Sequence, residues 1–112
     1  DRAGITRYGF FLLPMDEALI ETAVDISGRA HLSSDIKCPT EKVGDFDTEL
    51  VEEFLSAFVR TAGITLHVRQ IRGSNSHHII EAVFKSLGRA LKAAAAVDPA
   101  LGGRVPSTKG VL

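Results

Sequence analysis

Residues 47–68, DTELVEEFLSAFVRTAGITLHV, contain the change of hydrophobic period that decides the fold. Apolar residues first recur as pairs four positions apart, which places them on one face of a helix. After Gly63 the pattern changes, and Ile64, Leu66 and Val68 alternate with polar residues as in a strand with one buried face. The stretch therefore predicts a helix that ends at Gly63 and a strand that follows directly. The apolar stripe of this helix is Leu50, Val51, Phe54, Leu55, Phe58 and Val59.

Both helix boundaries and a second helix follow from the flanking residues. Asp47 is expected to cap the first helix, with Phe46 and Val51 packed as a hydrophobic staple across its start. A second helix is expected over residues 76–97, ended by Pro99 and the glycines that follow. Its expected core stripe is Ile79, Ile80, Val83, Phe84, Leu87, Ala90, Leu91 and Ala94.

Three strands are expected before the first helix. Residues 6–13 are rich in β-formers and end at Pro14, residues 20–26 alternate up to Gly28, and residues 31–36 form a shorter third strand. A polar loop with Pro39 and Gly44 follows. The order βββαβα predicts an α+β fold of two layers, in which one mixed four-stranded sheet carries both helices on one face.

Length and composition limit the alternatives. A chain of 112 residues, 45% hydrophobic and 24% charged with a net charge of -1, suits one domain over residues 1–112 with its own core. No apolar run is long enough to cross a bilayer, so no membrane partner is expected. The single cysteine, Cys38, leaves no internal disulfide and fits a reducing compartment. Any metal must be held by histidine and carboxylate.

The first residue, Asp1, starts the chain in what reads as the middle of a loop, which favours a fragment or a processed chain. The sequence carries no secretory signal. A cytoplasmic location is therefore expected, or a plastid if a plant transit peptide preceded Asp1.

Residues 73–81, GSNSHHIIE, hold the clearest chemical motif. At about 100° per residue, Glu81 lies only about 40° around the helix from His77, whereas His78 points about 100° away. His77 and Glu81 are therefore placed to share one metal ion, and His78 to bind a different one. Imidazole and carboxylate together suit manganese, iron or zinc. The alternative is that these residues are solvated and bind nothing.

Several basic and hydroxyl residues are candidates for binding a phosphate. Lys85 lies one turn beyond Glu81, on the same side of the helix. Arg7 and Arg29 are fork-shaped donors of the kind that phosphates recruit. In isolation, each of these is as well explained as a solvated surface residue. The C-terminal stretch adds Ser107, Thr108 and Lys109.

The ordered motifs together resemble the imidazoleglycerol-phosphate dehydratase family, over essentially all 112 residues and in its C-terminal half. The matching pieces are GITRYG (4–9), PMDEAL (14–19), DISGR (25–29), VGDFDTELV (43–51), ITLH (64–67), NSHHIIE (75–81) and PSTKGVL (106–112).

The resemblance implies a lyase of histidine biosynthesis that removes water from imidazole glycerol phosphate to give imidazole acetol phosphate. It implies a tandemly duplicated βββαβα unit, two Mn²⁺ ions per active site and a large homo-oligomer with sites at subunit contacts. His77 and Glu81 would ligate one ion and His78 the other, and these three carry the catalysis. The positions that would hold the substrate phosphate are Arg7, Arg29, Lys85 and Ser107 to Lys109.

Two departures from the family limit what can be carried over. The N-terminal half of the family enzyme, with its own histidine motif and its acid/base glutamate, is missing, so the expected partners are that half and other subunits. Many members also have a metal-ligating histidine where this chain has Glu53, which leaves Glu53 as a ligand or as a solvated acid. The competing hypothesis is a non-catalytic module that binds metal or phosphate. Nucleic acid is not an expected partner, because the chain has one Tyr, no Trp and no excess of basic residues.

Overall fold

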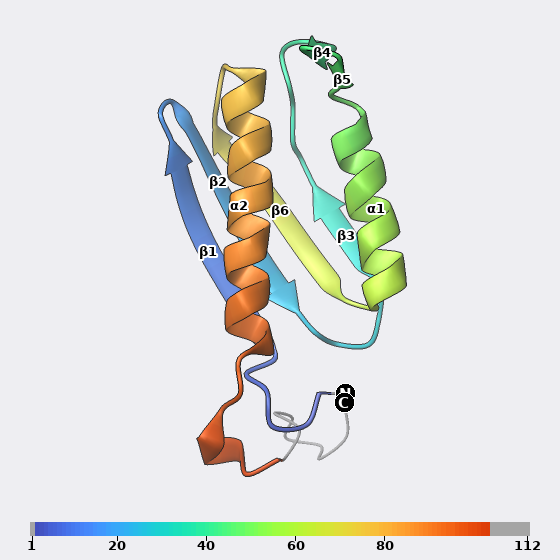
Figure 1. The fold of residues 1–112 in the computed structure, drawn as a ribbon, viewed down its shortest axis with the longest axis vertical. Coiled ribbons are helices and arrows are strands. Elements are labelled where there is room, and N and C mark those ends of the chain that lie inside the picture. The colour runs from blue at the N-terminus through green and yellow to red at the C-terminus, as the bar shows by residue number, and fades with distance from the viewer. Residues whose placement is uncertain (1, 104–112) are drawn as a thin grey trace.

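The computed structural model describes residues 2–103, and they form two layers (Figure 1). A four-stranded sheet has the order β1-β2-β6-β3, and both long helices cover one of its faces. A short hairpin, β4–β5, stands above the N-terminal end of α1 in this view. The elements in chain order are β1 (Tyr8–Met15), β2 (Ala18–Asp25), β3 (His31–Ser34), β4 (Lys42–Val43), β5 (Phe46–Asp47), α1 (Leu50–Ala62), β6 (Thr65–Arg72), α2 (Ser76–Ala95) and the short 3₁₀ helix η1 (Pro99–Leu101).

The sheet is mixed, as the sequence predicts. β1 pairs with β2 and β2 with β6 in antiparallel fashion, whereas β3 runs parallel to β6. The β3–α1–β6 segment is thus a crossover that returns the chain to the sheet, and α1 lies over β3. The α+β fold class and the βββαβα order are confirmed, with the β4–β5 hairpin as an addition inside the expected polar loop.

α2 packs closely on β1 and β2. In β2 every second residue from Ala18 to Val24 is buried, which is the alternation read from the sequence. A Cβ on Gly9 of β1 would lie 1.9 Å from the carbonyl oxygen of Ala90 in α2, so only glycine permits this approach. The buried hydroxyls of Thr22 and Ser86 lie 2.7 Å apart across the same interface. The layer contact thus combines close backbone approach with one buried polar pair.

Several expected boundaries differ in the structure: β3 ends at Ser34 and α2 at Ala95, each two residues earlier than expected. Glu49, not Asp47, is the N-cap of α1, and its side chain makes no capping hydrogen bond. Asp47 belongs to β5 instead, where its carboxylate pairs with Lys42 of β4 at 3.0 Å. Strand β1 runs past Pro14 to Met15; it lies at the sheet edge, where a missing amide hydrogen is tolerated. The expected stop at Gly63 is confirmed by its φ of 65°.

The helix stripes are only partly buried. Val51, Leu55 and Val59 of α1 are in the core, but Leu50 and Phe54 remain exposed. On α2, Phe84 is exposed too, and its ring lies 5.2 Å from that of Phe54. The buried face of α2 is rotated from the expected one and includes Ala82 and Ser86. Across residues 2–103, each helix is too short or too polar to span a bilayer.

Candidate active site and metal ligands

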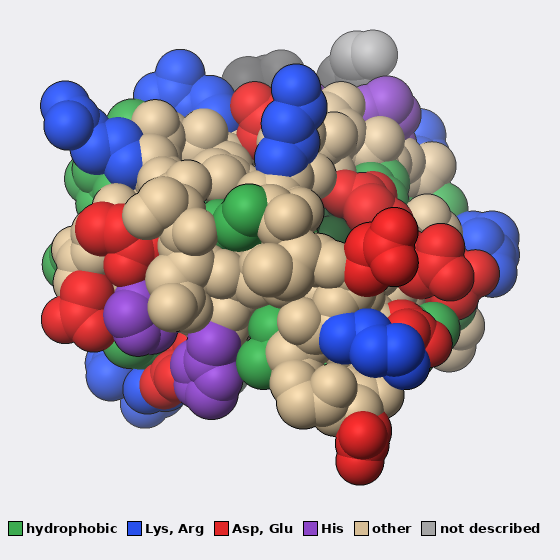
Figure 2. All heavy atoms as spheres, turned by 90° about the horizontal axis from the view of Figure 1, so that it is seen from above, with side chains coloured by type: hydrophobic (Ala, Val, Ile, Leu, Met, Phe, Trp, Pro, Cys, Tyr) green, Lys and Arg blue, Asp and Glu red, His purple; other side chains and the backbone are tan. Residues whose placement is uncertain are grey.

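The histidine motif lies at the end of the molecule where α2 begins, together with the β1–β2 turn (Figure 1). Viewed onto this end, histidine and acidic side chains are gathered side by side on the surface (Figure 2). Two hydrogen bonds to Glu17 explain why the turn and the helix start meet, because its Oε2 accepts the backbone N–H groups of Ser74 and Asn75, each at 2.9 Å. Asn75 is the N-cap of α2, and its side chain accepts the N–H of His78 at 3.0 Å.

His77 and Glu81 lie together on one face of α2, as the helix angles predict. His77 Nε2 is 3.1 Å from Glu81 Oε1, and the other oxygen of Glu81 is 2.7 Å from Lys85 Nζ. The pKa of Glu81 is lowered, first by its hydrogen bond to Lys85 and the charge of that residue, and less by His77. Glu81 is thus an ionised carboxylate flanked by an imidazole and an ammonium group, all at the protein surface.

His78 faces a different set of groups. Its ring stands at 84° to that of His77, with the centroids 6.2 Å apart. Nδ1 is 2.6 Å from Glu17 Oε1, and Nε2 is 3.4 Å from Asp16 Oδ2. The hydrogen bond to Glu17 raises the pKa of His78, and the same bond, followed by the amides of Ser74 and Asn75, lowers the pKa of Glu17 to about 2.

Sequence reasoning did not single out Asp16 or Glu17. The sequence signal that could have found them is their position between the first two expected strands. In the structure they form a two-residue turn, because Met15 and Ala18 pair directly. Asp16 has a φ of 52°, a left-handed conformation that non-glycine residues adopt uncommonly and that often marks a functional position. Both carboxylates of the turn then reach the ring of His78.

The donor types fit a divalent metal, but no complete site forms within residues 2–103. Imidazole nitrogen and carboxylate oxygen are the ligands that Mn²⁺, Fe²⁺ and Zn²⁺ share. In this described part of the chain, no group of three or more histidine, cysteine or acidic residues converges as a metal site would require. His77 with Glu81, and His78 on its own, are therefore partial ligand sets.

Glu53 does not join either set. It lies in the first turn of α1 and lines a hollow with exposed apolar side chains, Phe46, Leu50, Phe54 and Phe84. Phe46 also lines the neighbouring hollow that contains His77 and Glu81. The hollow of Glu53 and the hollow of His77 and Glu81 thus share the Phe46 side chain.

The expected phosphate-binding residues are not brought together. Lys85 is beside Glu81, whereas Arg7 directly precedes β1, a strand about 24 Å long by its rise per residue, whose other end leads into the turn beside His78. The Arg7 side chain is buried, with Nε 2.6 Å from Asp25 Oδ1. Arg29 follows β2 at the same end of the sheet as Arg7. Ser107, Thr108 and Lys109 lie outside the described residues.

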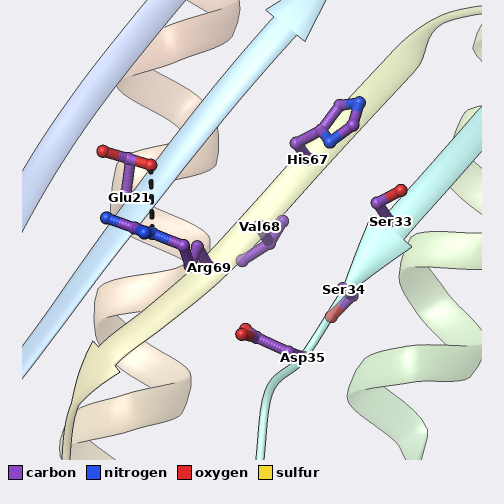
Figure 3. Close-up of a pocket in the computed structure, with 7 residues that line it drawn as sticks. All are labelled: Glu21, Ser33, Ser34, Asp35, His67, Val68 and Arg69. Atoms are coloured by element: carbon purple, nitrogen blue, oxygen red, sulfur yellow. Dashed lines mark ion pairs between the residues drawn. The ribbon is translucent and has the colours of Figure 1, made fainter.

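A third hollow lies on the face of the sheet opposite the helices (Figure 3). It has a volume of about 350 Å³ and contains the ion pair of Arg69 and Glu21, at 3.4 Å. His67, which precedes the histidine motif of residues 73–81, lines it, and its ring centroid is 5.7 Å from that of His31. This hollow therefore shares no residue with the histidine motif of α2.

Sequence comparisons connect these features to known proteins. The family model described as imidazoleglycerol-phosphate dehydratase matches residues 1–91. The imidazoleglycerol-phosphate dehydratase of Prochlorococcus marinus (strain NATL1A) is 57% identical over 112 residues, which is all of this chain and 55% of that protein. The chloroplastic enzyme of Pisum sativum is 56% identical over the whole chain and 40% of its own length. The chain thus spans about half the length of the curated relatives it matches.

Solved structures agree with the sequences. The crystal structure of imidazoleglycerol-phosphate dehydratase from Staphylococcus aureus superposes with a TM-score of 0.85 at 51% identity, covering 88% of this chain and 58% of that one. The enzyme from Pyrococcus furiosus, in complex with (S)-C348, gives the same TM-score at 41% identity over 96% of this chain and 58% of that one. The coverage is consistent with half of a duplicated fold. From its matched residues and its fold, this chain belongs to the imidazoleglycerol-phosphate dehydratase family.

Proposed function

We propose that this chain supplies part of the active site of a metal-dependent dehydratase of histidine biosynthesis, which converts imidazole glycerol phosphate to imidazole acetol phosphate. Membership of the family supports the proposal, because the matched relatives carry that enzyme's name. The observation that carries it is the divergence of two adjacent histidines. His77 lies against Glu81, whereas His78 is turned toward Glu17, as two separate metal ions would require.

We take the metal to be Mn²⁺, with two ions per active site as in the family that the chain resembles, because imidazole and carboxylate are donors that suit this ion. In this proposal His77 and Glu81 hold one ion and His78 contributes to the other, with Glu53 as a further carboxylate for one of them. When bound, the metal supplies positive charge that polarises the imidazole ring of the substrate and eases loss of a proton. The carboxylate of Glu81 offers the negative charge that such an ion needs, since its pKa is lowered.

Completion of each site requires ligands from elsewhere. A catalytic zinc is typically held by three protein ligands with one position open, and manganese favours six-coordinate geometry, so either metal needs more ligands than one partial set supplies. We assign the missing ligands to the N-terminal half of the enzyme and to neighbouring subunits in a large homo-oligomer. This assignment also explains the long separation between Arg7 and the histidines of the same chain.

The phosphate of the substrate is assigned to the cationic and hydroxyl groups. Lys85 is the cationic residue beside His77 and Glu81, with its ammonium 2.7 Å from Glu81. It can therefore bind an anion held near the metal that these two residues would ligate. Arg7 and Arg29 serve a site completed by another subunit, because Arg7 precedes β1 and Arg29 follows β2, at the end of the sheet opposite the β1–β2 turn. Ser107, Thr108 and Lys109 complete the proposed phosphate contacts.

The test uses the chain together with the N-terminal half of the enzyme. Dehydration should be abolished by a chelator, restored by Mn²⁺, and reduced by His77→Ala by more than the roughly 10- to 100-fold that is typical of losing an outer-shell partner of a metal ligand. His67→Ala is the matched control, because His67 is exposed on the opposite face of the sheet, and it should keep full activity. Normal turnover in metal-free protein would sink the proposal. Binding of Mn²⁺ and phosphate without turnover would favour a non-catalytic module instead.

A further inference from the structure

The side chain of Glu17 joins three groups that lie far from it in the sequence. Its Oε2 accepts the backbone N–H groups of Ser74 and Asn75, and its Oε1 is 2.6 Å from Nδ1 of His78. The pairing of β2 with β6 brings these parts together, since Leu19 lies opposite Arg72 at the end of both strands. Glu17 therefore occupies one defined position between the β1–β2 turn and the start of α2.

This arrangement determines which nitrogen of His78 carries the proton. An ionised carboxylate can only accept hydrogen bonds, so Nδ1 must be the donor toward Glu17. In the neutral ring the lone pair is then on Nε2. The neighbour of Nε2 is Asp16, whose side chain is 75% exposed and 3.4 Å away, whereas the side chain of His78 is 29% exposed. The ring is thus hydrogen-bonded through Nδ1, whereas the contact of Nε2 with the exposed Asp16 is longer and leaves Nε2 as the nitrogen that a ligand can reach.

The geometry points to Glu17 as a positioning residue, which fixes the Nδ1–H tautomer and the orientation of His78 so that Nε2 faces the metal. Asn75 supports the same orientation from the backbone, because its side chain accepts the N–H of His78. A carboxylate behind a metal-binding histidine raises the basicity of the ligating nitrogen and restricts rotation of the ring. The part of this inference that concerns metal rests on the proposed function.

The first test needs no metal and no activity. In metal-free protein above the pKa of His78, long-range ¹H–¹⁵N correlation NMR should show His78 as the Nδ1–H tautomer. Glu17→Gln should shift the ring toward the Nε2–H tautomer, because the amide carbonyl can accept from the Ser74 and Asn75 amides while its NH₂ group faces Nδ1. The matched control is Glu21→Gln in β2, which should leave the His78 tautomer unchanged.

The second test measures Mn²⁺ affinity by electron paramagnetic resonance. Glu17→Gln should weaken binding about 10- to 100-fold, Glu17→Asp should recover part of it, and Glu21→Gln should have no effect. A wild-type Nε2–H tautomer would overturn the inference without any variant, even if Glu17→Gln failed to fold. Unchanged Mn²⁺ affinity in a folded Glu17→Gln protein would overturn it too. If the tautomer responds as expected but wild-type protein binds no Mn²⁺, the positioning of His78 stands and the proposed metal-dependent function fails.

Discussion

Nε2 of His77 lies 3.1 Å from Oε1 of Glu81, across one turn of α2. Both side chains come from a single rigid helix, so their spacing is set locally and does not depend on the rest of the fold. The neighbouring His78 takes its contacts from a different part of the chain, the β1–β2 turn. One helix start therefore presents two candidate ligand sets that face different directions, and neither brings three such side chains together among the described residues.

Metal should promote assembly of the protein. Each partial ligand set gains its remaining donors from another half or subunit in the proposed enzyme, so Mn²⁺ binds the assembled state more tightly and stabilises it. Sedimentation velocity of the chain with its N-terminal half should show a larger species with Mn²⁺ than with a chelator. A double variant, His77→Ala with His78→Ala, should lose that response. An equal mass with and without metal would contradict the prediction.

Removal of Lys85 should separate metal binding from substrate binding. Its ammonium lies 2.7 Å from Glu81 and competes with a cation for that carboxylate. In Lys85→Ala, Mn²⁺ affinity should rise about two- to five-fold, the range for a solvent-exposed ion pair. The KM for the phosphate substrate should rise at the same time. Lys92→Ala, an exposed lysine two turns along α2, is the control for general charge effects. Weaker Mn²⁺ binding in Lys85→Ala would count against this account.

The titration of His78 should report its contact with Glu17. The pKa of His78 lies above the ordinary value of 6.5, first because of its hydrogen bond to Glu17. The stability that this pair adds is therefore fully present below pH 6.5, the ordinary pKa of histidine. It is lost as pH rises through the raised pKa of His78. On the acid side it is present above 4.5 and lost as pH falls through about 2.

An NMR titration of metal-free protein measures this shift directly. In Glu17→Gln, the pKa of His78 should fall toward 6.5, the ordinary value. Glu21→Gln should leave it where it is in the wild type. An unchanged pKa of His78 in Glu17→Gln would show that the contact with Glu17 is not formed in solution.

Features set by local geometry could be predicted from the sequence. The period of residues 47–68 gives the helix and strand in their correct order, and Gly63 ends α1 as expected. The helix angles likewise give the pairing of His77 with Glu81 and the divergence of His78. These predictions succeed because they depend only on residues a few positions apart.

Features set by tertiary contact could not be predicted in this way. Asp47 is a residue type that often caps helices, but its carboxylate forms an ion pair with Lys42 across the β4–β5 hairpin. The role of Glu17 depends on the register of β2 against β6, which no local pattern reveals. Arg7 carries the chemistry of a phosphate ligand, yet within one chain it is buried against Asp25.

Substitution of Gly9 tests the approach of α2 to β1. A Cβ at this position would lie 1.9 Å from the carbonyl oxygen of Ala90 and 2.8 Å from the amide nitrogen of Ala94, both backbone atoms that cannot move aside. Gly9→Ala should lower the free energy of unfolding by about 2 kcal/mol. Gly88→Ala is the matched control, since a Cβ there meets nothing within 4 Å, and it should raise the stability by about 0.5–1 kcal/mol. Urea unfolding measures both; equal effects would contradict the close packing.

The buried hydroxyl pair of Thr22 and Ser86 should behave as a coupled unit. Ser86 Oγ donates to the carbonyl of Val83 at 3.0 Å, so the Thr22 hydroxyl, 2.7 Å away, is the donor to Ser86. Thr22→Val removes that donor and leaves no buried hydroxyl at this position that needs a partner. It should lower the free energy of unfolding by about 1 kcal/mol. Ser86→Ala leaves the Thr22 donor buried without an acceptor and should cost about 1–3 kcal/mol.

The double variant decides between coupling and independence. With both hydroxyls gone, no buried donor is left unsatisfied. The loss of unfolding free energy in the double variant should therefore be smaller than the sum of the two single losses by about 1 kcal/mol. Chemical denaturation of the four proteins gives this coupling free energy. Strict additivity would mean that the two hydroxyls do not depend on each other, and that water satisfies Thr22 when Ser86 is removed.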